Sequence, residues 1–146
     1  SKKSNQSTIL KMNILKKIVL VLVFCFSVTA FSQARVDYTS TAVTMSVIQN
    51  NGKWSDYPPF KKTEVPVKVD FQNNRIVIYS EIEQVYRIGE YYPEKETKAE
   101  YINFFRCLSN DGDTTEITLK TSKKSNESQI YIKDKTRVLI YNLKRV

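Results

Sequence analysis

The 146-residue sequence contains no histidine. Imidazole is the usual base beside a nucleophilic Ser or Cys, a frequent metal ligand and the side chain that titrates near neutral pH. The sequence also lacks the glycine-rich phosphate loops of nucleotide-binding proteins, and no Ser is followed by Lys three positions later. We therefore expect a protein without catalytic residues, metal or cofactor.

Cysteine is nearly absent, with only Cys25 and Cys107 in the chain. Because Cys25 lies in a segment that we expect to be removed (below), the remaining part cannot form an intrachain disulfide. Cys107 lies in the apolar stretch 102–108, which predicts a buried and unreactive thiol. A bridge from Cys107 to another chain is the alternative that the sequence leaves open.

Long apolar runs are missing as well, and the most apolar segment of the chain is short. Lys16 and Lys17 precede the apolar segment 18–26, and Ser32-Gln33-Ala34 provides the small residues of a signal-peptidase site. The pattern predicts a signal peptide over 12–34, cleaved before Arg35, and a periplasmic or secreted protein. Even the span 18–31 is shorter than the roughly 20 residues of a membrane-spanning helix, so we expect no stable membrane insertion after cleavage.

Residues 1–11 precede the first plausible initiator, Met12, and are polar without periodicity. We interpret them as upstream or vector-derived sequence. With only three Gly and four Pro and no linker, residues 35–146 are predicted to form a single domain.

An excess of basic residues gives the chain a formal charge of +8. Five lysines and no acidic residue precede Arg35, which leaves 18 basic against 15 acidic residues in 35–146, or +3. These charges are interspersed, whereas a nucleic-acid surface needs clustered cations. We expect no nucleic-acid partner.

Alternation of apolar and polar residues recurs along 35–146, and no sustained helical period is present. Val67 and Val69 point to one face and Lys68 and Asp70 to the other, as in a strand with one buried face. The sequence predicts an all-β fold. The expected strands are 36–49, 65–71, 75–79, 82–92, 99–109, 114–121, 129–133 and 137–143.

Turn residues lie between these strands. Asn73-Asn74, Asn110 to Asp113 and Asp134-Lys135 each predict a hairpin connection. About eight strands with short connections predict a single antiparallel meander, closed into a small barrel or strongly curled, because closure removes exposed strand edges. A two-sheet β-sandwich is the alternative.

Paired carboxylates are one catalytic arrangement that needs no histidine. Glu81 and Glu83 at i and i+2 would project from the same face of a strand and could cleave a glycoside. Alternate polar residues are also what any solvated strand face shows, so we favour a non-enzymatic protein.

Aromatic residues are abundant, with nine Tyr, seven Phe and one Trp. Trp54, Tyr57 and Phe60 flank Pro58-Pro59 in a connection between strands, and they are the candidate interaction residues. The competing interpretation is that Trp54 plugs one end of the barrel.

Gly52-Lys53-Trp54 has the form of the Gly-x-Trp element of lipocalins. In lipocalins that element opens the first strand, whereas here a strand precedes it, so we set this likeness aside. Residues GKWSDY followed by IVIYSEIEQVYRI make the chain resemble the small exported β proteins of unknown function in Gram-negative bacteria, a family without an assigned activity.

These observations predict an exported, monomeric binding or interaction module with an unknown protein partner, acting through the Trp54–Phe60 loop. The alternative is a lipocalin-like carrier whose barrel holds a small apolar or amphipathic ligand. The interior distinguishes the two hypotheses, since a carrier needs a lined cavity.

Overall fold

The computed structural model describes residues 2–29 and 35–146, which fall into two separate compact units. The first contains one helix, α1 (Lys2–Thr29), which begins within the segment before Met12 and continues into the predicted signal peptide. The predicted cleavage site at 32–34 lies outside the described residues. Within the part of the chain that the structure describes, no helix has both the length and the apolarity to cross a bilayer.

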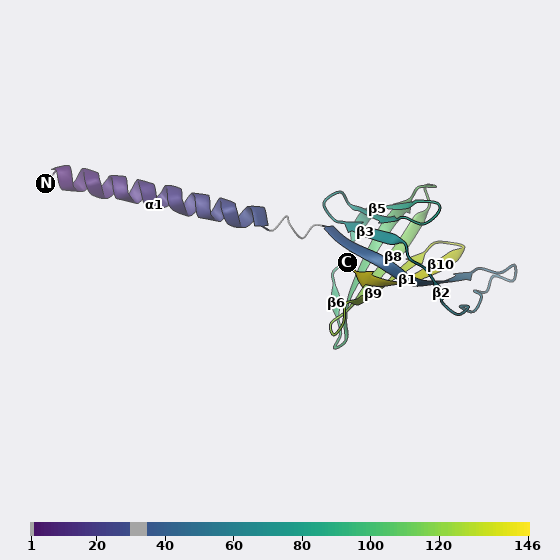
Figure 1. Ribbon diagram of the computed structural model, residues 1–146. Coiled ribbons are helices and arrows are strands. Elements are labelled where there is room, and N and C mark those ends of the chain that lie inside the picture. The colour runs from purple at the N-terminus through teal and green to yellow at the C-terminus, as the bar shows by residue number, and fades with distance from the viewer. Residues whose placement is uncertain (1, 30–34) are drawn as a thin grey trace. The chain divides into compact units, whose positions relative to one another are not determined.

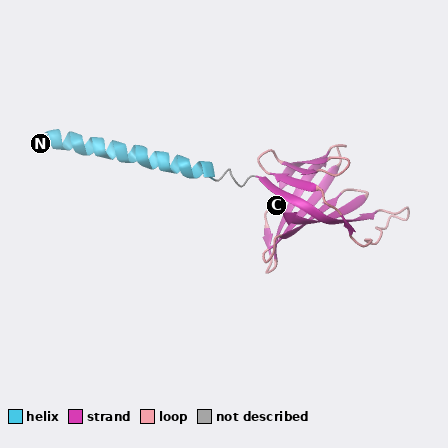
Figure 2. Ribbon diagram, viewed as in Figure 1, coloured by secondary structure: helices cyan, strands magenta, loops and turns pink. Residues whose placement is uncertain are grey.

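The second unit is a closed antiparallel β-barrel, as Figures 1 and 2 show. Eight strands form it in chain order: β1 (Arg35–Val47), β3 (Pro66–Asp70), β4 (Arg75–Ile78), β5 (Gln84–Tyr91), β7 (Glu100–Ser109), β8 (Thr114–Ser122), β9 (Glu127–Lys133) and β10 (Arg137–Arg145). Each pairs with the next, and β10 pairs with β1. The all-β meander is confirmed, and the barrel rather than the sandwich is observed.

Two short strands were not predicted. β2 (Lys61–Lys62) pairs with β1 beyond the end of β3, and β6 (Lys95–Glu96) pairs with β7 beyond the end of β5. Each continues a neighbouring strand after an interruption. Two consecutive charged residues carry no alternation, which explains why the pattern did not reveal them.

The hairpin of β3 and β4 agrees with prediction. Val67 and Val69 are fully buried, and the strand begins at Pro66, which has no N–H to donate. The turn has four residues, 71–74, with Asn74 at φ 52°. Asp70, expected to face water, is only 5% exposed, because its carboxylate accepts hydrogen bonds from the backbone and side-chain amides of Asn73.

Closure of the barrel depends on β1 and β10, which pair from Tyr38↔Arg145 to Val47↔Arg137. A bulge between Ser40 and Ala42 shifts the alternation of β1 by one residue. Tyr38 is in the core before the bulge, and Val43 packs against the core after it. Because the alternation is shifted, Thr44 and Ser46, which follow Val43 on β1, point to the outer face.

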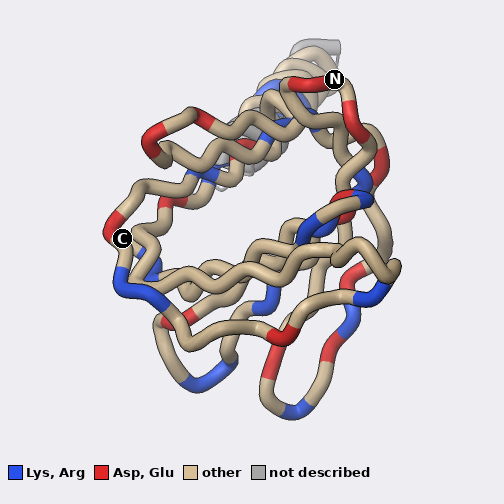
Figure 3. The backbone as a smooth tube through the Cα atoms, turned by 90° about the vertical axis from the view of Figure 1, so that its right-hand side faces the viewer, with Lys and Arg blue, Asp and Glu red and all other residues tan. Residues whose placement is uncertain are grey.

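The interior is filled by side chains from all eight strands. The large side chains less than 2% exposed are Ile76, Ile78, Ile117, Ile130, Leu143, Val67 and Val69. Figure 3 shows the chain running round a ring. The side chains named above belong to one buried cluster. The predicted burial of Cys107 is confirmed, at 3% exposed and in this same core.

Different contacts lie toward the two ends of the barrel. Near the β3–β4 turn, the rings of Tyr91 and Phe105 pack edge-on with 5.7 Å between their centres. The centre of the Phe71 ring lies 6.0 Å from that of Phe105. At the opposite end, the Tyr86 hydroxyl donates to Gln84 Oε1 and the Gln84 amide reaches the Tyr141 oxygen at 3.3 Å. Trp54 takes part in neither set of contacts.

Candidate interaction site

The connection from β1 to β2, residues 48–60, is called the arm here, and Figure 1 shows it projecting beyond β2. It starts as a small hairpin in which Ile48 pairs with Trp54. Gly52 sits at φ +78° in its turn, a conformation that residues with a Cβ rarely adopt. The sequence Asn50-Asn51-Gly52 therefore sets the direction in which the chain returns to the barrel.

Outward-facing hydroxyls of β1 anchor the arm. Ser46 Oγ donates to the Ser55 carbonyl at 2.5 Å, and Thr44 Oγ1 donates to the Pro58 carbonyl at 2.7 Å. The backbone N–H of Val47 donates to Ser55 Oγ at 2.9 Å. These bonds join residues 8 to 14 positions apart, and they fix the returning half of the arm against the outer face of the barrel.

The three candidate residues are exposed on this anchored arm. Trp54 is 39%, Tyr57 50% and Phe60 44% exposed. Trp54 lines a hollow together with outward side chains of β7, β8, β9 and β10. The prediction that it plugs the barrel is therefore wrong, because the hairpin carries it along the outside.

A hollow of about 650 Å³ lies between the arm and the outer face of the barrel. Trp54 and Tyr57 line it, but Phe60 does not. The "outer hollow" is defined by Trp54, Tyr57, Phe104, Tyr131, Lys120 and Lys133. The structure thus joins two of the three candidates to side chains of β7, β8 and β9, while Phe60 stays exposed elsewhere on the arm.

Strand register brings the barrel side of the hollow together. Phe104 pairs with Thr118, which pairs with Tyr131, so three neighbouring strands contribute one row of outward side chains. The row continues to Ile140, which is only 7% exposed although it faces away from the core. The arm crosses this row, because Thr44 pairs with Ile140 and bonds Pro58.

Sequence reasoning missed Tyr131, Lys120 and Lys133 as site residues. A signal was present, since alternation places Phe104 and Tyr131 on outer faces where small polar residues are usual. The pattern placed large side chains on both faces of the strand that became β7. It contained no information that the arm folds back toward Phe104 and Tyr131.

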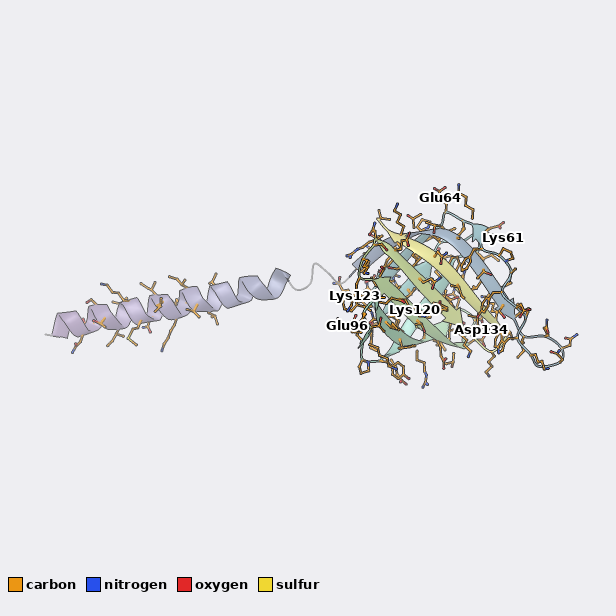
Figure 4. The ribbon with its side chains drawn as sticks, turned by 90° about the horizontal axis from the view of Figure 1, so that it is seen from below. Lys61, Glu64, Glu96, Lys120, Lys123 and Asp134 are labelled. Carbon is orange, nitrogen blue, oxygen red and sulfur yellow. The ribbon has the colours of Figure 1, made fainter. Side chains whose placement is uncertain are left out.

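Cations accompany the aromatic rings of the hollow. Lys120 Nζ lies 4.8 Å from the centre of the Tyr131 ring, and Lys95 Nζ lies 5.4 Å from that of Phe104. Within the hollow, Lys120 and Lys133 face a single carboxylate, that of Glu116. Figure 4 places Lys120 midway along the barrel, between Lys123 and Glu96 at one end and Asp134 toward the other. Aromatic side chains, called the aromatic floor below, thus line the outer hollow together with two lysines and one glutamate.

Titratable groups inside the barrel are held neutral. Burial raises the pKa of the Cys107 thiol to about 12, and burial raises the pKa of Tyr86 to about 12. A thiol in this state is a poor nucleophile. Among the described residues, no three acidic or cysteine side chains gather as a metal site.

Glu81 and Glu83 do not share a strand face, because β5 begins only at Gln84 and both lie in the preceding loop. They border a depression of about 450 Å³ at the barrel end, together with Asp111, Asp113, Asp134 and Arg137. Five of its lining residues are acidic and one is basic, and this charge does not suit the apolar ligand of the carrier hypothesis.

Comparisons of the chain with models of known families, with curated proteins and with solved structures found no match in any of the three. The resemblance to small exported β proteins of Gram-negative bacteria therefore stays a prediction, and the function must be argued from the barrel and its arm.

Proposed function

We propose that this protein is an exported, non-catalytic interaction module that binds a partner protein in the periplasm or outside the cell. The binding surface is the arm together with the outer hollow. The observation that carries the proposal is the exposure of Trp54, Tyr57 and Phe60 on a segment that is hydrogen-bonded to the barrel.

Anchoring matters because a recognition loop loses affinity when it must be ordered on binding. The bonds from Ser46 and Thr44 supply that order in the free protein. Tyr and Trp contribute large contact areas with few rotatable bonds, and they are enriched where interfaces concentrate their binding energy.

The interior supports this function over a carrier. The core residues Ile76, Ile78, Ile117 and Ile130 are each fully buried, so the space that a carrier would offer is occupied by side chains. The absence of histidine from the chain and the neutral state of Cys107 favour a module without catalysis.

The test uses the barrel unit 35–146, which contains every buried side chain that the structure describes. Wild type, Trp54→Ala and Tyr57→Ala are immobilised and exposed to envelope and culture-fluid extracts, and captured proteins are identified by mass spectrometry. A partner should be retained by wild type and lost with both variants. Thermal melting should change little, because both side chains are exposed.

Tyr79→Ala is the matched control, since Tyr79 is a similarly exposed aromatic residue, at 38%, outside the hollow. It should capture the partner as wild type does. Equal capture by Trp54→Ala and wild type would contradict the proposal. A large fall in melting temperature for Trp54→Ala would show that its role is structural.

A further inference from the structure

Ile82 is the most exposed large apolar side chain of the barrel apart from the C-terminal residue, at 82%. It stands between Glu81 and Glu83 in the loop 80–83, called here the acidic loop. An isolated exposed apolar residue needs no explanation by itself. Its setting, however, is both ordered and strongly charged.

Hydrogen bonds hold the acidic loop in one shape. Ser80 Oγ donates to the Ile82 carbonyl at 2.7 Å, and the Gln84 amide donates to Ser80 Oγ at 3.0 Å. The Asn110 amide donates to the Glu83 carbonyl at 3.2 Å. The loop therefore presents Ile82 to solvent on a fixed support, flanked by two carboxylates.

The outer hollow has the complementary chemistry. Its aromatic floor would accept an aliphatic side chain, and Lys120 and Lys133 would face the carboxylates on either side of it. The barrel end around the acidic loop is negative as a whole, with five carboxylates and one arginine. Opposite charges on two surfaces of one molecule favour the approach of one copy to another.

We propose that the acidic loop of one copy docks in the outer hollow of a second copy, with Ile82 against the aromatic floor. The depression that the loop borders and the outer hollow have no lining residue in common. The two surfaces are thus separate on one copy, and in the head-to-tail association that we propose a pair joined by one contact leaves one loop and one hollow free. This departs from the monomer expected from the sequence.

A loop seated in one hollow buries less surface than stable interfaces do, so the association is weak and depends on concentration. It does not require the partner of the proposed function. Self-association and binding of the partner protein would compete, because both use the outer hollow. This competition is the one consequence that rests on the proposed function.

The experiment is sedimentation equilibrium of the barrel unit from micromolar to millimolar concentration. The average mass of wild type should rise with concentration, and added salt should reduce the rise because the contact contains charge pairs. Ile82→Asp should stay monomeric, as should the double variant Lys120→Glu/Lys133→Glu. Leu108→Asp, an exposed apolar residue outside the outer hollow, should associate as wild type does.

Mixing the two monomeric variants gives the most specific result. Ile82→Asp keeps an intact hollow, and the lysine variant keeps an intact loop, so the mixture should form a 1:1 complex and grow no further. Lys98→Glu/Lys144→Glu controls for the change in net charge and should associate normally.

A wild type that stays monomeric throughout, or an Ile82→Asp variant that associates as wild type does, would overturn the proposal. Association retained by the lysine variant would show that the loop binds elsewhere and would overturn the hollow as its receptor. Ile82→Asp should still capture the partner protein, so failure of self-association and failure of the proposed function are separate outcomes.

Discussion

Ser46 on β1 donates its hydroxyl hydrogen to the carbonyl oxygen of Ser55 on the arm, although Ser46 itself is only 1% exposed. The bond exists because the bulge after Ser40 turns this side chain outward. A small shift in strand alternation thereby decides where the aromatic residues of the arm are held.

Removing this hydroxyl tests the anchor. Ser46→Ala should reduce the free energy of unfolding by about 1 kcal/mol, the usual contribution of one hydrogen bond. Amide hydrogen exchange at Ser55 and nearby arm residues should accelerate, while exchange in β7 and β8 stays unchanged. Unchanged exchange in the arm would show that Thr44 and Val47 hold it without Ser46.

The inward register of β3 predicts unequal responses at adjacent positions. Val67→Asp should lower the free energy of unfolding by several kcal/mol, because it places an unpaired carboxylate in a fully buried site. Lys68→Gln removes the contact of Nζ with the Tyr79 ring, 5.6 Å from its centre, and should cost less than about 1 kcal/mol. Urea titration measures both values, and equal losses would contradict the register.

Asp70 should make the barrel sensitive to acid. The Asn73 side-chain hydrogen bond, more than any other contact, holds the pKa of this carboxyl below its ordinary 3.8. The ionised group therefore stabilises the fold above that value, and the contribution is lost as pH falls toward the folded-state pKa. Asp70→Asn should show a smaller loss of stability between neutral pH and about pH 3 than wild type. Asp37→Asn, at an exposed position on β1, is the control.

Cys107 should report unfolding. Its thiol is buried, and burial raises its pKa to about 12, so an aromatic disulfide reagent should not react with native protein at neutral pH. Denaturant should expose the thiol, and its reaction should follow the unfolding transition measured by circular dichroism. Rapid reaction of the native protein would show that the core opens locally at β7.

Export remains to be tested in cells. When the sequence is expressed from Met12 in a Gram-negative host, the soluble envelope fraction should contain a chain that begins at or near Arg35. N-terminal sequencing identifies that residue. Full-length protein in the membrane pellet would instead make the segment 18–31 an uncleaved anchor.

The sequence predicted most of the strands because each alternates with one buried face, as Val67 and Val69 do. It did not distinguish a barrel from a sandwich, since alternation within strands is the same in both. Closure depends on the pairing of β1 with β10, a relation between distant segments that no local pattern contains.

The candidate site was predicted in part for a similar reason. Trp54, Tyr57 and Phe60 were visible as aromatic residues in a connection, but their location depends on hydroxyls such as Thr44 that look like ordinary outward residues of a strand. The sequence did not reveal the direction in which the arm leaves β1. Without the bulge between Ser40 and Ala42, strand alternation would turn Thr44 toward the core, away from Pro58.

The pairing of β1 with β10 also has a consequence for how the chain acquires its structure. Tyr38 on β1 pairs with Arg145 on β10, so the barrel cannot close before β10 is in place. Contacts between such distant segments slow folding, since the intervening chain must be ordered first. A chain whose first and last strands must pair stays open until β10 is ordered, so the barrel gains most of its stability in one late step.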